Sequence, residues 1–157
     1  MFQVHDRVFV GNDSHCLPGT ELLAVVHACK SPCHQRAVGY SGSIPNNHPY
    51  YLGTRRPFDL YLNMIDPPVP LFKVGLFTMF LSFFRDQQRT RTPVLVHCNR
   101  GESRAPSLAL VLLSKHLGVI PASSFAAAHA SFSRIYPAYA PGAGISQFLE
   151  ENWDQIR

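Results

Sequence analysis

The segment from His97 to Arg104 combines residue types that can supply a nucleophile and an anion clamp. It reads His-Cys-Asn-Arg-Gly-Glu-Ser-Arg and follows a short apolar run at residues 94–96. Such a run is typical of a buried central strand, so we expect Cys98 to lie at the end of a sheet. An apolar helix begins at Arg104. A loop of this length can turn consecutive backbone N–H groups inward at the positive end of that helix, which predicts a concave site for a phosphate dianion.

The residues of this loop have distinct expected roles. The inward N–H groups would stabilise the Cys98 thiolate, which makes this sulfur the candidate nucleophile. Arg104 can donate to two phosphate oxygens and hold the phosphorus in line with the sulfur. Gly101 permits a turn that a side chain would resist, and His97 is placed to orient the loop through a hydrogen bond. The predicted phosphate-binding residues are Asn99, Arg100, Gly101, Glu102, Ser103 and Arg104.

A thiolate that attacks phosphorus needs an acid to protonate the leaving alkoxide or phenoxide. Asp66 is the candidate, because it follows a strand-like segment at 60–65 and precedes prolines that stiffen its loop. The same carboxylate would afterwards activate the water that hydrolyses the phosphocysteine. Asp59 is the nearest rival, but its position at the start of that strand makes it less suited to reach the mouth of the loop.

The His-Cys-x-x-Gly-x-Ser-Arg pattern, with Asp66 upstream and an apolar helix downstream, resembles the cysteine-dependent dual-specificity protein phosphatases of the tyrosine phosphatase superfamily. The resemblance runs from residues 8–11 through a helix at 144–149. It implies hydrolysis of phosphotyrosine, and of phosphoserine or phosphothreonine, through a phosphocysteine and without metal or other cofactor. It also implies that Cys29, at another strand end, can form a reversible disulfide with Cys98. A small buried hydrophobic residue is the alternative role for Cys29.

The sequence departs from the family pattern at several positions. Members usually carry Ser or Thr after the motif arginine, where the hydroxyl assists loss of the intermediate, whereas this chain has Ala105. The Arg-Ala-Pro ending is similar to that of the phosphatases of regenerating liver and puts rapid turnover in question. The usual Asn before the last helix is replaced around 141–142. We expect Glu102 to face away from the phosphate and Arg100 to reach toward a second negative group on the substrate.

Two alternatives therefore stay open. The first keeps the chemistry but acts on a phosphoinositide, an RNA 5′ end or a small phosphorylated molecule. The second is a low-turnover pseudophosphatase that binds phosphorylated partners. Ala105 is the residue that favours this alternative.

The order of elements that must position these residues predicts an α/β fold. We expect a mostly parallel central sheet of four to five strands flanked by helices, forming one catalytic domain over residues 1–157. The predicted strands are 8–11, 22–28, 60–65 and 94–96, and the predicted helices are about 71–85, 104–117, 122–134 and 144–152. Residues 31–57 are rich in Gly, Pro, Ser and Asn and predict a long surface loop. Its Tyr50, Tyr51, Arg55 and Arg56 would either line the site entrance or pack within the loop.

Composition narrows the class of protein. Hydrophobic residues make up 46% of the 157 residues and charged residues 15%, which excludes disorder through lack of burial. No apolar stretch is long enough to span a membrane and no signal peptide is evident, so we expect a cytoplasmic protein. Most of the 14 basic residues are Arg, which suits an anionic substrate such as a phosphorylated protein or peptide. No nucleic-acid signature is present, and the oligomeric state stays open.

Cysteines in a chain of this kind favour catalysis, metal binding or redox chemistry over structural disulfides. His27, Cys29, Cys33 and His34 are of metal-ligating types. Their spacing is tight and no second pair follows, so the sequence does not predict a structural zinc site from them. Cys16 belongs to no pattern.

Overall fold

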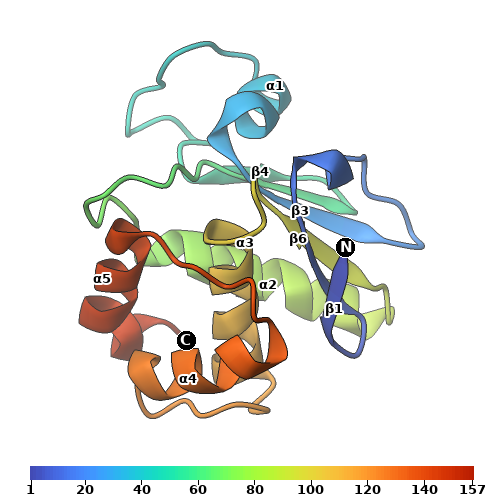
Figure 1. Cartoon of the computed structure of the whole chain (residues 1–157). Coiled ribbons are helices and arrows are strands. Elements are labelled where there is room, and N and C mark those ends of the chain that lie inside the picture. The colour runs from blue at the N-terminus through green and yellow to red at the C-terminus, as the bar shows by residue number, and fades with distance from the viewer.

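The computed structural model describes residues 1–157 and places a six-stranded sheet between helices (Figure 1). The strands are β1 (Phe2–His5), β2 (Val8–Gly11), β3 (Ala24–Ala28), β4 (Gly53–Arg55), β5 (Asp59–Leu62) and β6 (Val94–His97). Their order across the sheet is β1-β2-β6-β3-β5-β4. The four inner strands are parallel, and the two edge strands pair antiparallel to their neighbours. The predicted α/β class with a mostly parallel sheet is confirmed. The sheet has six strands, where four to five were expected, because short strands form at its two edges.

Strand β6 occupies the interior of the sheet, which explains its continuous apolar sequence. All of its residues are buried, and it pairs with β2 on one side and β3 on the other. The register sets His97 opposite both Gly11 and His27. The carboxyl end of β6 is therefore enclosed by the ends of two parallel neighbours, where ligand sites of parallel α/β sheets form.

Helices cover both faces of the sheet unequally. The helices α2 (Val74–Arg89), α3 (Arg104–Val111), α4 (Phe125–Ile135) and α5 (Ala143–Asn152) lie on one face, and the short α1 (Gln35–Val38) lies on the other (Figure 1). Residues Ala105 to Val111 of α3 are all buried, as expected for a helix that is apolar on every side. The chain continues from α3 into a π-helical turn at Leu112–His116. None of the helices has the length and hydrophobicity needed to cross a membrane.

The region predicted as one long loop contains regular structure. A π-helical turn at Lys30–His34 leads directly into α1, and β4 forms near the end of the segment. The prediction of one long surface loop over 31–57 was therefore wrong in part, because these elements are too short to produce a periodic pattern. Strand β3 begins two residues later than expected, since Thr20 and Leu23 pair with each other in a turn.

The burial of α3 predicts the largest stability losses for substitutions in that helix. Leu108 is 0% exposed within the core, so Leu108→Ala should lower the free energy of unfolding by about 2–5 kcal/mol. The matched control is Leu22→Ala, because Leu22 is 80% exposed and its loss should cost within about 0.5 kcal/mol. Urea unfolding followed by circular dichroism measures both, and equal losses would contradict this placement of α3.

Candidate active site

The loop from Cys98 to Ser103 connects the end of β6 to the start of α3. Cys98 is buried, and its backbone N–H donates to the Gly11 carbonyl at 3.4 Å. Gly101 has a φ of +73°, and a Cβ at this position would lie 2.9 Å from the same Gly11 carbonyl oxygen. Both the left-handed backbone and the close approach of β2 require glycine here, as the sequence predicts.

The outer side of the loop is fixed by hydrogen bonds to its oxygen atoms. The Asp13 N–H donates to the Asn99 carbonyl at 3.1 Å, the Tyr136 hydroxyl to the Gly101 carbonyl at 2.7 Å, the Ala140 N–H to the Glu102 carbonyl at 2.8 Å and the Gly142 N–H to the Ser103 hydroxyl at 2.9 Å. These donors come from the segments after β2 and after α4. Because the oxygens point outward, the peptide N–H groups turn toward the opposite side.

The backbone N–H groups of residues 99–103 donate to no acceptor in the protein. A run of consecutive free N–H groups beside the start of a helix is the arrangement that binds oxyanions. The N–H groups without a protein acceptor thus form one unbroken stretch between Cys98 and Arg104.

Arg104 is held at the first position of α3 by two neighbours. One terminal nitrogen donates to the Met64 carbonyl at 2.9 Å, and the other donates to the Asn99 side-chain oxygen at 2.6 Å. The Nε atom is buried and has no partner. Since a guanidinium carries five N–H donors, the Nε–H and the remaining terminal N–H groups stay free to grip two oxygens of an anion.

The two candidate acids lie in different environments. Asp66 is exposed in the loop after β5, and a Cβ at Gly142 would lie 2.5 Å from its carboxylate oxygen. Because the Gly142 N–H bonds Ser103, this contact places Asp66 beside the loop that carries Cys98. Asp59 is buried at the start of β5 and accepts from the Gly19 N–H at 2.8 Å and from His27 Nε2 at 2.9 Å. The Asp59 carboxylate therefore already binds Gly19 and His27, and it is less suited than Asp66 to donate a proton at the loop.

The His97 ring lies on the β3 side of the sheet. Its Nε2 is 2.8 Å from His27 Nδ1, and its Nδ1 is buried without a partner. Burial, followed by the charge of His27, lowers the pKa of His97 to about 4, so the ring is neutral at pH 7. The ring nitrogen that has a partner contacts His27 and not the loop, so a role in orienting the loop stays a prediction.

Cys29 follows the end of β3 and lies next to the loop. Its thiol is 2.7 Å from the Ser31 carbonyl and 3.5 Å from the Asn99 side-chain oxygen. A hydrogen bond from the Cys33 thiol is the main cause that lowers the pKa of Cys29 to about 6, against the opposing effect of burial. All four cysteines are free thiols. The Cys29–Cys98 disulfide stays a prediction.

Other residues singled out from the sequence lie further from the loop interior. Arg100 and Glu102 pair with each other at 3.3 Å, with side chains 82% and 42% exposed. Arg55 pairs with Asp86 of α2 at 3.0 Å, and Arg56 lies over the Tyr61 ring. These contacts assign the two arginines to packing around β4 and β5.

A cavity of about 480 Å³ adjoins the site. It is lined by Lys30, Tyr51, Ile65 and Lys73, among others. The Lys30 N–H donates to the same Met64 carbonyl that accepts from Arg104, so one carbonyl group connects the cavity lining to Arg104.

Sequence reasoning missed the residues that fix the outer side of the loop. Tyr136 and Tyr139 follow α4, and the Tyr139 hydroxyl bonds the buried Ser107 of α3 at 2.9 Å. No spacing rule connects these tyrosines to the loop, because the contact depends on how α4 packs against α3. The aromatic pair after a predicted helix is the only signal that could have drawn attention to them.

Solved structures of phosphatases and of a phosphatase-like protein have a similar fold. The human tyrosine phosphatase-like serine/threonine/tyrosine-interacting protein matches with a TM-score of 0.67 and 18% identity, covering 98% of this chain and 95% of that one. Human DUSP28 gives 0.67 and 16% identity over 99% and 97%. A mouse putative dual specificity phosphatase gives 0.65 and 18% identity over 98% and 85%. Neither a protein-family model nor a curated protein sequence matches the chain.

The similarity therefore rests on three-dimensional structure at low sequence identity, and it extends over nearly the whole of this chain. Together with the β6–loop–α3 geometry, it establishes that the chain has the dual-specificity phosphatase fold.

Proposed function

We propose that residues 1–157 form a single cysteine-dependent phosphatase domain that hydrolyses phosphotyrosine, and phosphoserine or phosphothreonine, in proteins or peptides. The observation that carries this proposal is the run of unpartnered N–H groups at residues 99–103, which begins next to Cys98 and ends at Arg104. This arrangement can bind a phosphate dianion and a thiolate at the same place. The fold shared with phosphatases supports the same assignment.

The reaction proceeds in two displacements. In the first, the Cys98 thiolate attacks phosphorus, the bond from phosphorus to the substrate oxygen breaks, and Asp66 gives that oxygen its proton. In the second, Asp66 takes a proton from water as the water oxygen attacks phosphorus, and the phosphorus–sulfur bond breaks. Inorganic phosphate leaves and the thiolate is restored. The side chains of the chain itself supply every proton transfer.

The loop lowers the barrier of both displacements by stabilising charge. The N–H groups of residues 99–103, which have no protein acceptor, would donate to the equatorial oxygens, and the Arg104 guanidinium would add a fixed positive charge with a buried Nε–H. The contacts to Met64 and Asn99 hold that guanidinium before substrate binds, so little reorganisation accompanies the reaction.

A second function, phosphate-dependent binding with little turnover, is favoured by one observation. Ala105 is buried directly after Arg104 and offers no hydroxyl to assist loss of phosphate from sulfur. The tyrosine phosphatase-like interacting protein among the similar structures carries a name consistent with such a binding role on this fold. Hydrolysis of a phosphoinositide, an RNA 5′ end or a small phosphorylated molecule would use the same chemistry. Assays with these substrates distinguish it from the hydrolysis of phosphorylated proteins.

Two substitutions test the nucleophile and the clamp. Cys98→Ser should reduce hydrolysis of p-nitrophenyl phosphate and of a phosphotyrosine peptide to background, because a neutral hydroxyl replaces the thiolate. Arg104→Lys should reduce kcat by about a hundred-fold or more, because lysine cannot donate in the same fork. Phosphate release in steady state measures both.

The matched control for the arginine variant is Arg134→Lys, because Arg134 is exposed on α4 and should keep full activity. Activity retained in Cys98→Ser would contradict the proposed nucleophile. If the unchanged protein releases one leaving group per chain and then stops, the binding function replaces the catalytic one. Parallel assays with phosphothreonine peptide and a phosphoinositide decide the substrate class.

Asp66→Ala tests the proton transfer. Loss of the acid should slow the phosphotyrosine peptide by about 10²–10⁴-fold, whereas p-nitrophenyl phosphate should slow much less, because its leaving group needs no proton. Asp6→Ala is the control, since Asp6 is an exposed carboxylate in the turn after β1. Equal losses on both substrates would exclude Asp66 as the general acid.

A further inference from the structure

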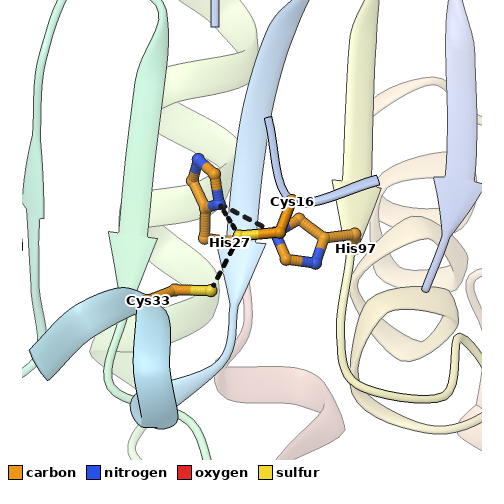
Figure 2. A group of neighbouring side chains, drawn as sticks. All are labelled: Cys16, His27, Cys33 and His97. Carbon is orange, nitrogen blue, oxygen red and sulfur yellow. Dashed lines mark hydrogen bonds between the residues drawn. The ribbon is translucent and has the colours of Figure 1, made fainter. Parts of the chain in front are cut away.

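Four side chains that the proposed reaction does not use converge behind the phosphate loop. They are Cys16, His27, Cys33 and His97, and their ligand atoms all lie within 4.8 Å of one another (Figure 2). His27 comes from β3, His97 from β6, Cys33 from the π-helical turn after β3, and Cys16 from the segment after β2. We call these four residues the thiol–imidazole cluster.

The distances within the cluster are close to those between the ligands of a zinc ion. Cys16 Sγ lies 3.2 Å from Cys33 Sγ and 3.8 Å from His27 Nδ1, and His27 Nδ1 lies 2.8 Å from His97 Nε2. In a tetrahedral zinc site with two sulfur and two nitrogen ligands, neighbouring ligand atoms are about 3.3 to 3.8 Å apart. Side-chain shifts of about half an ångström to one ångström would bring the four atoms to that geometry, because their separations run from 2.8 Å to at most 4.8 Å.

The surroundings of His27 are those of a metal-ligating histidine. Its Nε2 faces the buried Asp59 carboxylate at 2.9 Å, and its ring stacks on Tyr61 with ring centroids 4.3 Å apart. Asp59 accepts a hydrogen bond from Nε2, so the proton of the neutral ring sits there and the Nδ1 lone pair points into the cluster. Ligating histidines in proteins are usually oriented by a carboxylate in this way.

The protein alone leaves the second histidine poorly satisfied. Because His27 Nδ1 carries no proton, the 2.8 Å contact requires His97 Nε2 to donate. The proton of the neutral His97 ring is then used, and His97 Nδ1 remains a buried acceptor without a partner. Bound metal removes this requirement, because the facing nitrogens of both rings then present lone pairs to the ion.

Charge and access also fit a metal ion. Two thiolates balance the charge of a divalent cation, and nitrogen and sulfur ligands in four-coordinate geometry select zinc over calcium or magnesium. Cys16 is exposed, and it lines a surface cavity of about 290 Å³ together with His27 and Cys33. Arg36 and Arg56 line the same cavity.

We propose that Cys16, His27, Cys33 and His97 bind one zinc ion in a closed structural site. The ion would join β3, β6, the π-helical turn and the segment after β2 at the carboxyl ends of the strands. Since His97 directly precedes Cys98, the site would fix the position at which the phosphate loop begins. The proposal does not depend on phosphatase activity.

The test measures metal binding directly. The protein, purified with a phosphine reductant and without chelators, should contain one zinc per chain by mass spectrometry of the metal. Cobalt(II) added to the metal-depleted protein should give the intense visible bands of a tetrahedral thiolate site. X-ray absorption at the zinc edge should show two sulfur and two nitrogen neighbours. Any other ligand set would overturn the proposal.

Variants assign the ligands. Cys16→Ser should lose stoichiometric zinc, and Asp59→Asn should weaken zinc binding by about 10–100-fold. Cys29→Ser is the matched control, because this thiol lies outside the cluster and its loss should leave one zinc per chain. Circular dichroism reports whether each variant is folded. Should a Cys16→Ser variant fail to fold, the sulfur count from X-ray absorption of the unchanged protein still decides.

The nitrogen NMR shifts of the histidines give an independent readout. Zinc should place the His97 proton on Nδ1 and leave the His27 proton on Nε2. The proposal would be overturned if the protein took up no zinc while thiol titration showed all four cysteines to be free. A Cys16–Cys33 disulfide that persists under the phosphine reductant would also overturn the proposal. So would equal zinc binding by the wild-type protein and the Cys16→Ser variant.

Discussion

The orientation of the peptide groups between Cys98 and Arg104 is the constraint on which the rest of the structure depends. Each peptide that turns its N–H toward a bound anion must turn its carbonyl outward, and a buried carbonyl needs a donor. The segments after β2 and after α4 supply these donors at 2.7 to 3.1 Å. The free N–H groups are thus a consequence of packing by elements that never touch the anion.

The sequence could predict the parts of this arrangement that are local in the chain. The apolar run before Cys98, the glycine at 101 and the apolar helix after Arg104 each follow from short-range chemistry, and the strand, the left-handed glycine and α3 all form as expected. Edge strands β1 and β4 escaped prediction because each has only three or four residues and one exposed side. Such strands form because a neighbouring strand is present, not because their own pattern requires them.

The difference between local and long-range contacts also explains why the sequence did not reveal the thiol–imidazole cluster. His27, Cys29, Cys33 and His34 are close in sequence, and their spacing does not predict a zinc site. In the structure the Nε2 of His34 bonds the Tyr50 carbonyl at 2.8 Å, whereas Cys16 and His97 complete the cluster from distant segments. The register of β3 with β6, which sets His27 opposite His97, is a property of the folded sheet and is not encoded in any spacing.

Phosphate binding by the loop can be measured without turnover by following the backbone amide resonances of the protein by NMR during titration with tungstate, an unreactive oxyanion. Large, saturable shifts centred on residues 99–104, weakened in an Arg104→Lys variant, are the result expected of inward N–H groups. Unchanged resonances in that stretch, or saturable shifts confined to the exposed Arg55 and Arg56, would contradict the proposed binding site.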